Sequence, residues 1–81
     1  MKGFVDFLRI DRGFGFAYDM DKKVRYFFFM SNVVGEPPQV GSLIDFVPGE
    51  TLKGPVALKV HVLDRAEIVA AMLDGLGGDK S

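Results

Sequence analysis

The sequence contains no cysteine and no tryptophan, and it has a single histidine. The absence of cysteine excludes disulfides and thiolate metal sites, and it fits a reducing compartment better than a secreted one. His61 has no second histidine or cysteine with which to complete a zinc site. We therefore expect neither a bound metal nor another cofactor.

An excess of positive charge is also missing. Ten Lys and Arg stand against eleven Asp and Glu, so no global basic field attracts a polyanion, and any nucleic-acid binding must come from aromatic rings or a local patch. No apolar run is long enough to cross a bilayer, and the opening MKGFVDF lacks the pattern of a signal peptide. We expect a cytoplasmic protein. Ser31, Ser42 and Ser81 have no base nearby in the sequence, so catalysis is not expected.

What the sequence does contain is a series of short apolar segments bounded by turn residues. Five strands are predicted, over Lys2–Ile10, Phe14–Tyr18, Val24–Met30, Leu43–Val47 and Val56–Leu63. Three loops separate the later strands, over Asp19–Lys23, Ser31–Ser42 and Pro48–Pro55. Five strands in 81 residues cannot bury their apolar faces as a flat sheet, so we predict an all-β, five-stranded antiparallel OB-type Greek-key barrel. Its predicted core is Val5, Phe28, Val33, Ile44, Phe46, Leu58, Val60 and Val62.

The end of the chain has a different character. Residues 64–76 carry apolar side chains at helical spacing (Ile68, Val69, Met72 and Leu73), so a short C-terminal helix is predicted after a barrel domain of residues 1–63. Residues 77–81 are expected to form a flexible tail. Two interpretations of the helix stay open. It folds back over an open end of the barrel, or it pairs with a second copy in a homodimer, for which strand exchange is another route.

Alternation in the segment FGFAY places Phe14, Phe16 and Tyr18 on one strand face and only Gly15 and Ala17 on the other. The small residues suit the inner side of a curved strand, which leaves the rings exposed. Three further rings join them if the neighbouring strands pair: Phe7, Phe27 and Phe29. The alternative is that these rings are simply core.

Exposed aromatic rings are typical platforms for unpaired bases, which stack on them at about 1–3 kcal/mol per base. Basic residues near such a surface can pair with phosphates; the candidates are Arg9 and Arg12, with Lys2, Lys22, Arg25, Lys53 and Lys59 as helpers. We therefore predict a protein that binds single-stranded RNA or DNA. A second hypothesis is an interaction module that uses the same rings and the C-terminal helix for assembly.

Three stretches resemble a known family. GFVDFLRIDRGFGFAY is similar to the cold-shock domain pattern G-x-V-x-W-F-N-x-x-K-G-F-G-F-I, YFFFMSNV to V-F-V-H-F-S-x-I, and LKGPVALKV to K-G-P-x-A-x-x-V. The resemblance runs from Lys2 to about Leu63, in the right order and spacing. It implies a member of the bacterial cold-shock family, an OB-type barrel that binds single-stranded RNA and DNA as an RNA chaperone, without cofactor or catalysis.

The resemblance also implies which residues bind. The stacking positions are Phe7, Phe14, Phe16, Phe27, Phe29 and Met30, and Arg12 stands at the lysine of the first motif. The chain departs from the family where Phe29 replaces histidine, Met30 replaces phenylalanine and Asp6 replaces lysine. The full predicted site is Phe7, Arg9, Arg12, Phe14, Phe16, Phe27, Phe29, Met30 and Lys53.

Overall fold

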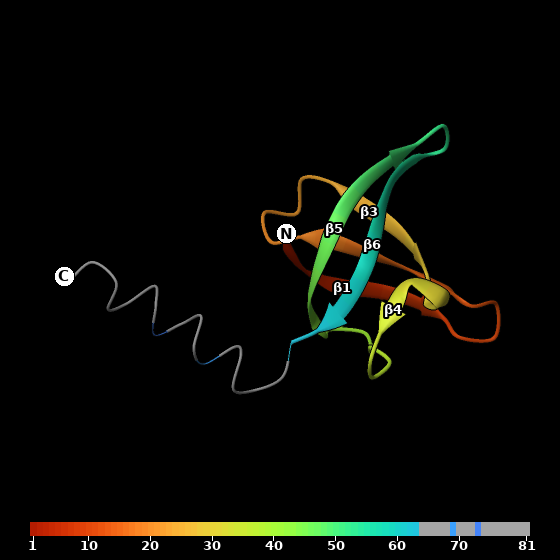
Figure 1. The fold of residues 1–81 in the computed structure, drawn as a ribbon. Helices are drawn as coiled ribbons and strands as arrows, with labels where there is room; N and C mark the ends of the chain where they lie inside the picture. The colour runs from red at the N-terminus through yellow and green to blue at the C-terminus, as the bar shows by residue number, and fades with distance from the viewer. Residues whose placement is uncertain (64–68, 70–72, 74–81) are drawn as a thin grey trace.

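The computed structural model describes residues 1–63 together with Val69 and Leu73. Residues 1–63 are all-β apart from one short 3-10 turn (Figure 1). The elements are β1 (Lys2–Arg9), β2 (Phe14–Asp19), β3 (Arg25–Phe29), η1 (Met30–Asn32), β4 (Val33–Val34), β5 (Leu43–Thr51) and β6 (Gly54–Val62). The five predicted strands are therefore present, with β4 in addition.

The strands form one sheet in the order β3-β2-β1-β5-β6-β4. A further pairing, parallel and through Phe27 and Val56, joins β3 to β6 and closes the five long strands into a barrel. The predicted OB-type barrel is consistent with this arrangement. The two-residue strand β4 pairs with β6 through Val33 and Val34. It lies in the segment predicted as a loop, since two residues are too few to show the alternation typical of a strand.

The predicted loop Pro48–Pro55 is wrong. β5 continues to Thr51 and β6 begins at Gly54, with Pro48 opposite Ala57 and Glu50 opposite Pro55. The pairing of β5 with β1 is confined to Leu43–Asp45, so Pro48 lies where its missing N–H interrupts no bond to β1. Figure 1 shows the resulting long β5–β6 hairpin reaching beyond the rest of the barrel. Only Leu52 and Lys53 form its tip.

The core contains most of the predicted residues and three more. Val5, Phe28, Ile44, Phe46 and Val60 are buried as predicted, and Ala17, Tyr26 and Ala57 are buried with them. Val33 and Val62 are partly buried and pack against this core. Leu58, however, is 37% exposed, so its assignment to the core is wrong.

A β-bulge in β6 explains the error at Leu58. Between the pairs Val47–Leu58 and Asp45–His61, β6 has one residue more than β5, and Lys59 adopts a left-handed backbone with φ of 50°. The extra residue shifts the alternation, so that Ala57 and Val60, three positions apart, both face inward. A strict period of two cannot anticipate such a shift.

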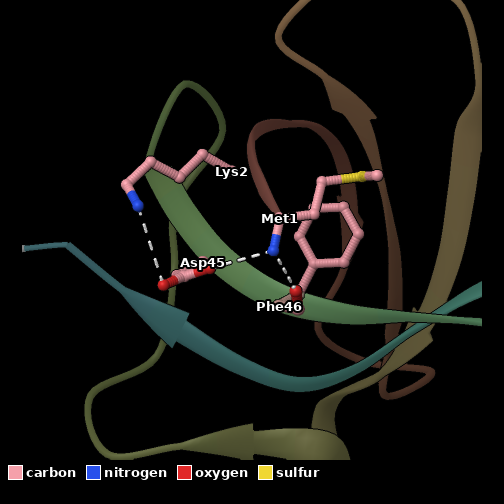
Figure 2. Close-up of polar contacts among 4 residues, drawn as sticks. All are labelled: Met1, Lys2, Asp45 and Phe46. Atoms are coloured by element: carbon pink, nitrogen blue, oxygen red, sulfur yellow. Dashed lines mark hydrogen bonds and ion pairs between the residues drawn. The ribbon is translucent and has the colours of Figure 1, made fainter.

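The start of β1 is attached to β5. The Met1 amine donates to the Phe46 carbonyl oxygen at 2.8 Å and lies 3.3 Å from Asp45 Oδ1, and Lys2 Nζ lies 3.9 Å from Asp45 Oδ2 (Figure 2). The Phe46 N–H in turn donates to the Met1 carbonyl at 2.8 Å. The exposed ion pairs add little stability, so the main-chain bonds matter most here.

The predicted helix over residues 64–76 and the predicted tail over 77–81 lie almost entirely outside the described residues. Val69 and Leu73 are described, and they are 44% and 61% exposed. Neither side chain is therefore buried against the barrel. The helix and its two interpretations remain predictions.

Candidate functional site

Strand β2 has the two faces that its alternation predicts. Gly15 and Ala17 are buried, whereas Phe14, Phe16 and Tyr18 are partly exposed. A Cβ at Gly15 would lie 2.8 Å from Leu8 Cδ2, from Phe28 Cζ and from the Phe7 carbonyl oxygen. No larger residue fits there without displacing its neighbours. The missing side chain lets the core close behind β2, and the phenylalanines point outward.

Five phenylalanines from three strands form a continuous group, which we call the ring face: Phe7, Phe14, Phe16, Phe27 and Phe29. Phe27 lies at its centre, with ring centroids 5.5 Å from Phe14, 5.4 Å from Phe16 and 4.9 Å from Phe29. Register explains the grouping, because Phe16 is opposite Phe27 and Phe14 is opposite Phe29. Phe29 is 55% exposed, Phe7 is 38% exposed and the other three rings are partly exposed, so each offers surface to a ligand.

Phe7 reaches the ring face through a β-bulge in β1. Val5 pairs with Ala17 but Phe7 pairs with Phe16, so Asp6 is an extra residue between them. Without this bulge Phe7 would face inward with Val5, two positions away. Instead the Phe7 ring lies 6.1 Å from Phe16 and 6.4 Å from Phe14. The sequence prediction placed Phe7 correctly but had no account of this shift.

Asp6 and Arg25 form an ion pair across the ring face. Arg25 Nη2 lies 2.9 Å and Nε 3.2 Å from Asp6 Oδ2, and Arg25 Cζ lies 4.1 Å from the centre of the Phe16 ring. The Arg25 side chain is 42% exposed, and the Asp6 side chain is 24% exposed. Asp6, which stands where the resemblance expects lysine, therefore positions a cation from β3 over a ring of β2.

A groove of about 670 Å³ runs between the ring face and the β5–β6 hairpin. Phe16, Phe27 and Phe29 form one wall, and the other wall consists of residues 51–56 at the hairpin tip. This arrangement brings the predicted Lys53 to the site, at the edge of an apolar groove of the size that ligands occupy. It also adds Leu52, fully exposed at the tip, which the loop prediction for residues 48–55 had no means to place.

The two predicted arginines before β2 are exposed. Arg9 forms a two-point contact with Asp11, with Nη2 3.0 Å from Oδ2 and Nε 3.1 Å from Oδ1. The hydrogen bonds from Arg9 hold the pKa of Asp11 below its ordinary value, and the same bonds raise the pKa of Arg9. Arg12 lies in the exposed turn that joins β1 to β2. Arg9 is opposite Phe14 in the sheet register, which places it beside the ring face.

Other predicted residues lie elsewhere. Met30 is in η1, is partly buried and packs against the core, so part of its side chain is used for packing. Lys59 lines a separate hollow with Asp45 and His61, and Lys2 pairs with Asp45. These two lysines are therefore not part of the ring face. Lys22 lies over the ring of Phe4, a residue that is not in the predicted site.

Within residues 1–63, Val69 and Leu73, no group of three or more potential metal ligands occurs. None of the helices searched in that part of the chain has the length and hydropathy of a membrane span. The ring face itself offers stacking and apolar contact, bordered by guanidinium and ammonium groups.

Of the comparisons with known proteins, the one with solved structures supports the fold. No family model and no curated protein sequence matches the chain. A solved structure described as "drosophila Unr CSD456", in which CSD abbreviates cold-shock domain, matches with a TM-score of 0.66 and 20% identity. The match covers 79% of this chain and 26% of that chain. The chain therefore has the fold of a cold-shock domain and spans about a quarter of that neighbour.

Proposed function

We propose that this protein binds single-stranded nucleic acid, with bases stacked on the ring face. The observation that carries the proposal is the contact chain through Phe27, whose ring touches those of Phe14, Phe16 and Phe29 at the surface of the barrel. A large, contiguous apolar patch on a protein surface generally marks a binding site. Rings stack on unpaired bases, whereas a duplex offers only base edges and backbone.

Charge supports a mode of binding led by stacking. The formal net charge is −1, and carboxylates already pair with Arg9 and Arg25 beside the rings. Binding through phosphates alone would need an uncompensated basic surface. The finer assignment, an RNA chaperone of bacterial cold-shock type, rests on the three motifs of the sequence and is part of this proposal. A place in the cytoplasm, which the absence of cysteine favours, is also part of it. Such a protein acts by binding and not by catalysis.

The test is substitution of the central ring. Phe27→Ala should weaken binding of an oligothymidine more than tenfold, because it removes a platform and loosens three ring contacts. Val47→Ala is the matched control, since Val47 is 50% exposed and lines the hollow near Asp45 and Lys59 instead. Phe27→Leu, which keeps apolar volume without a ring, covers the case in which Phe27→Ala unfolds. Unchanged affinity in a folded Phe27→Leu variant would contradict the proposal.

The competing hypothesis is that the ring face is an assembly surface. The apolar groove against the β5–β6 hairpin is the observation in its favour, because a partner protein could fill it. Sedimentation over a concentration series separates the two hypotheses. Nucleic-acid binding predicts a monomer whose rings are available, whereas assembly predicts a larger species whose buried rings are unavailable to oligonucleotide.

A further inference from the structure

A second, smaller aromatic group lies beyond the ring face on the same side of the sheet. Phe4 on β1 and Tyr18 on β2 are register partners, and their rings stack with centroids 6.0 Å apart and planes 28° apart. Their chain neighbours Gly3, Val5 and Ala17 are buried, so the pair faces outward. Neither ring belongs to the core cluster, and both are partly exposed.

Two cations are placed over this pair. Lys22 Nζ lies 5.8 Å from the centre of the Phe4 ring, and Arg25 Cζ lies 5.9 Å from that of Tyr18. Lys22 is held by the turn between β2 and β3, where the Asp19 carboxylate accepts the N–H groups of Lys23 and Val24 at 2.9 and 3.2 Å. Because this turn is built from internal hydrogen bonds, the backbone that carries Lys22 is already ordered before a ligand binds.

Arg25 connects the two aromatic groups. Its guanidinium is 4.1 Å from the Phe16 ring on one side and 5.9 Å from the Tyr18 ring on the other, and Asp6 fixes it there. A chain that leaves Phe16 along β2 therefore meets a guanidinium and then a second stacked pair of rings. The planar guanidinium therefore lies between two stacking platforms and continues the surface from one to the other.

We propose that Phe4 and Tyr18, with Lys22 and Arg25, form an additional base-stacking subsite for single-stranded nucleic acid, which lengthens the footprint beyond the ring face. The inference rests on the proposed function, since it extends the same ligand past Arg25. Two arguments select this ligand: the subsite is continuous with the ring face through Arg25, and Lys22 places an ammonium group beside the rings, where a phosphate of a stacked strand would pass. A purely structural cross-strand pair would need neither cation.

Ligand length provides the test. Oligothymidines of about 4 to 16 nucleotides cover the range of site sizes of single barrels. Tyr18→Leu should bind the shortest ligands as the parent does, and it should bind the longest about tenfold more weakly, because one stacking platform is lost. Phe4→Leu should behave in the same way. Tyr18→Phe keeps the ring and should match the parent at every length.

A spectroscopic measurement locates the contact directly. The chain has no tryptophan and two tyrosines, of which Tyr26 is 7% exposed. In a Tyr26→Phe background, tyrosine fluorescence therefore reports Tyr18 alone. Long oligothymidines should quench it, and the shortest should not, because they occupy the ring face.

The outcomes separate the two claims. If Tyr18→Leu binds long ligands as the parent does while Phe27→Ala loses binding, the subsite is wrong and the proposed function stands. If Phe27→Ala is also without effect, the proposed function fails. If Tyr18→Leu instead dissociates a dimer in sedimentation, the pair is a contact between copies of the chain, and the subsite is again overturned.

Discussion

Arg25 on β3 reaches over β2 to Asp6 on β1, with Nη2 2.9 Å from Oδ2, and its guanidinium lies 4.1 Å from the centre of the Phe16 ring. One carboxylate thus fixes the position of a cation at the middle of the aromatic surface. The same carboxylate neutralises that cation and repels a phosphate. Asp6 therefore fixes the position of the Arg25 side chain but weakens the attraction of Arg25 for a phosphate.

The first prediction follows from this pair. Asp6→Asn should tighten binding of an oligothymidine a few-fold, because Arg25 becomes free to pair with a phosphate. One added phosphate contact on a single strand should steepen the slope of log K against log salt by about 0.7. Fluorescence anisotropy at several salt concentrations measures both quantities.

Asp45→Asn is the matched control for Asp6→Asn. It removes the same charge, but its partners are Met1 and Lys2 at the start of β1 (Figure 2). Equal gains in the two variants would mean that only net charge matters. The account requires a larger gain at Asp6.

A second prediction concerns the bare side of β2. Gly15→Ala should destabilise the fold by about 1–3 kcal/mol, since its Cβ would lie 2.8 Å from three atoms, one of them a backbone oxygen. Urea unfolding gives the free energy. Gly13→Ala is a comparison, because it meets nothing within 4 Å but holds φ of 77° and should cost about 1 kcal/mol. A smaller cost at Gly15 than at Gly13 would contradict the crowding.

A third prediction tests the bulge in β6. Leu58→Ala should cost less than about 1 kcal/mol because Leu58 is 37% exposed, whereas Val60→Ala should cost about 2 kcal/mol because Val60 is fully buried. The alternation of the sequence alone predicts large losses at both positions. Urea unfolding of the two variants decides between them.

How far the sequence predicts the molecule can be judged at these positions. The rings of Phe14, Phe16 and Phe27 were placed correctly because they sit in regular strands, where a period of two holds. Leu58 was misplaced because Lys59 takes a left-handed backbone that breaks the period. The bulge at Asp6 is equally invisible in the sequence, as is the ion pair of Asp6 with Arg25, which depends on β1, β2 and β3 lying side by side.

The β5–β6 hairpin gives a further example. Two prolines and two glycines between Pro48 and Pro55 are typical of a loop, and local propensity favours that prediction. The long-range pairing of β5 with β6 extends the strands through this segment instead. The groove that results, with Leu52 and Lys53 opposite the rings, was therefore out of reach of local patterns.

A fourth prediction concerns pH. The hydrogen bonds from Arg9 lower the pKa of Asp11 in the folded protein, so their stabilising effect is present above the pKa of the unfolded chain. It is lost as the pH falls through the lower, folded value, in a window below about pH 4. A carboxyl titration by NMR should give Asp11 a pKa below its ordinary value. Arg9→Gln should bring it back, and no change in that variant would contradict the pairing.

The most direct test of the central claim compares one oligonucleotide as a single strand and as a duplex. Titration of the protein at about 0.05 and 0.2 M salt should give at least tenfold tighter binding to the single strand, with a shallow salt slope, because stacking carries the affinity. Equal affinity for the duplex, or a steep salt slope, would contradict the account, since both indicate binding through phosphates and not through the rings.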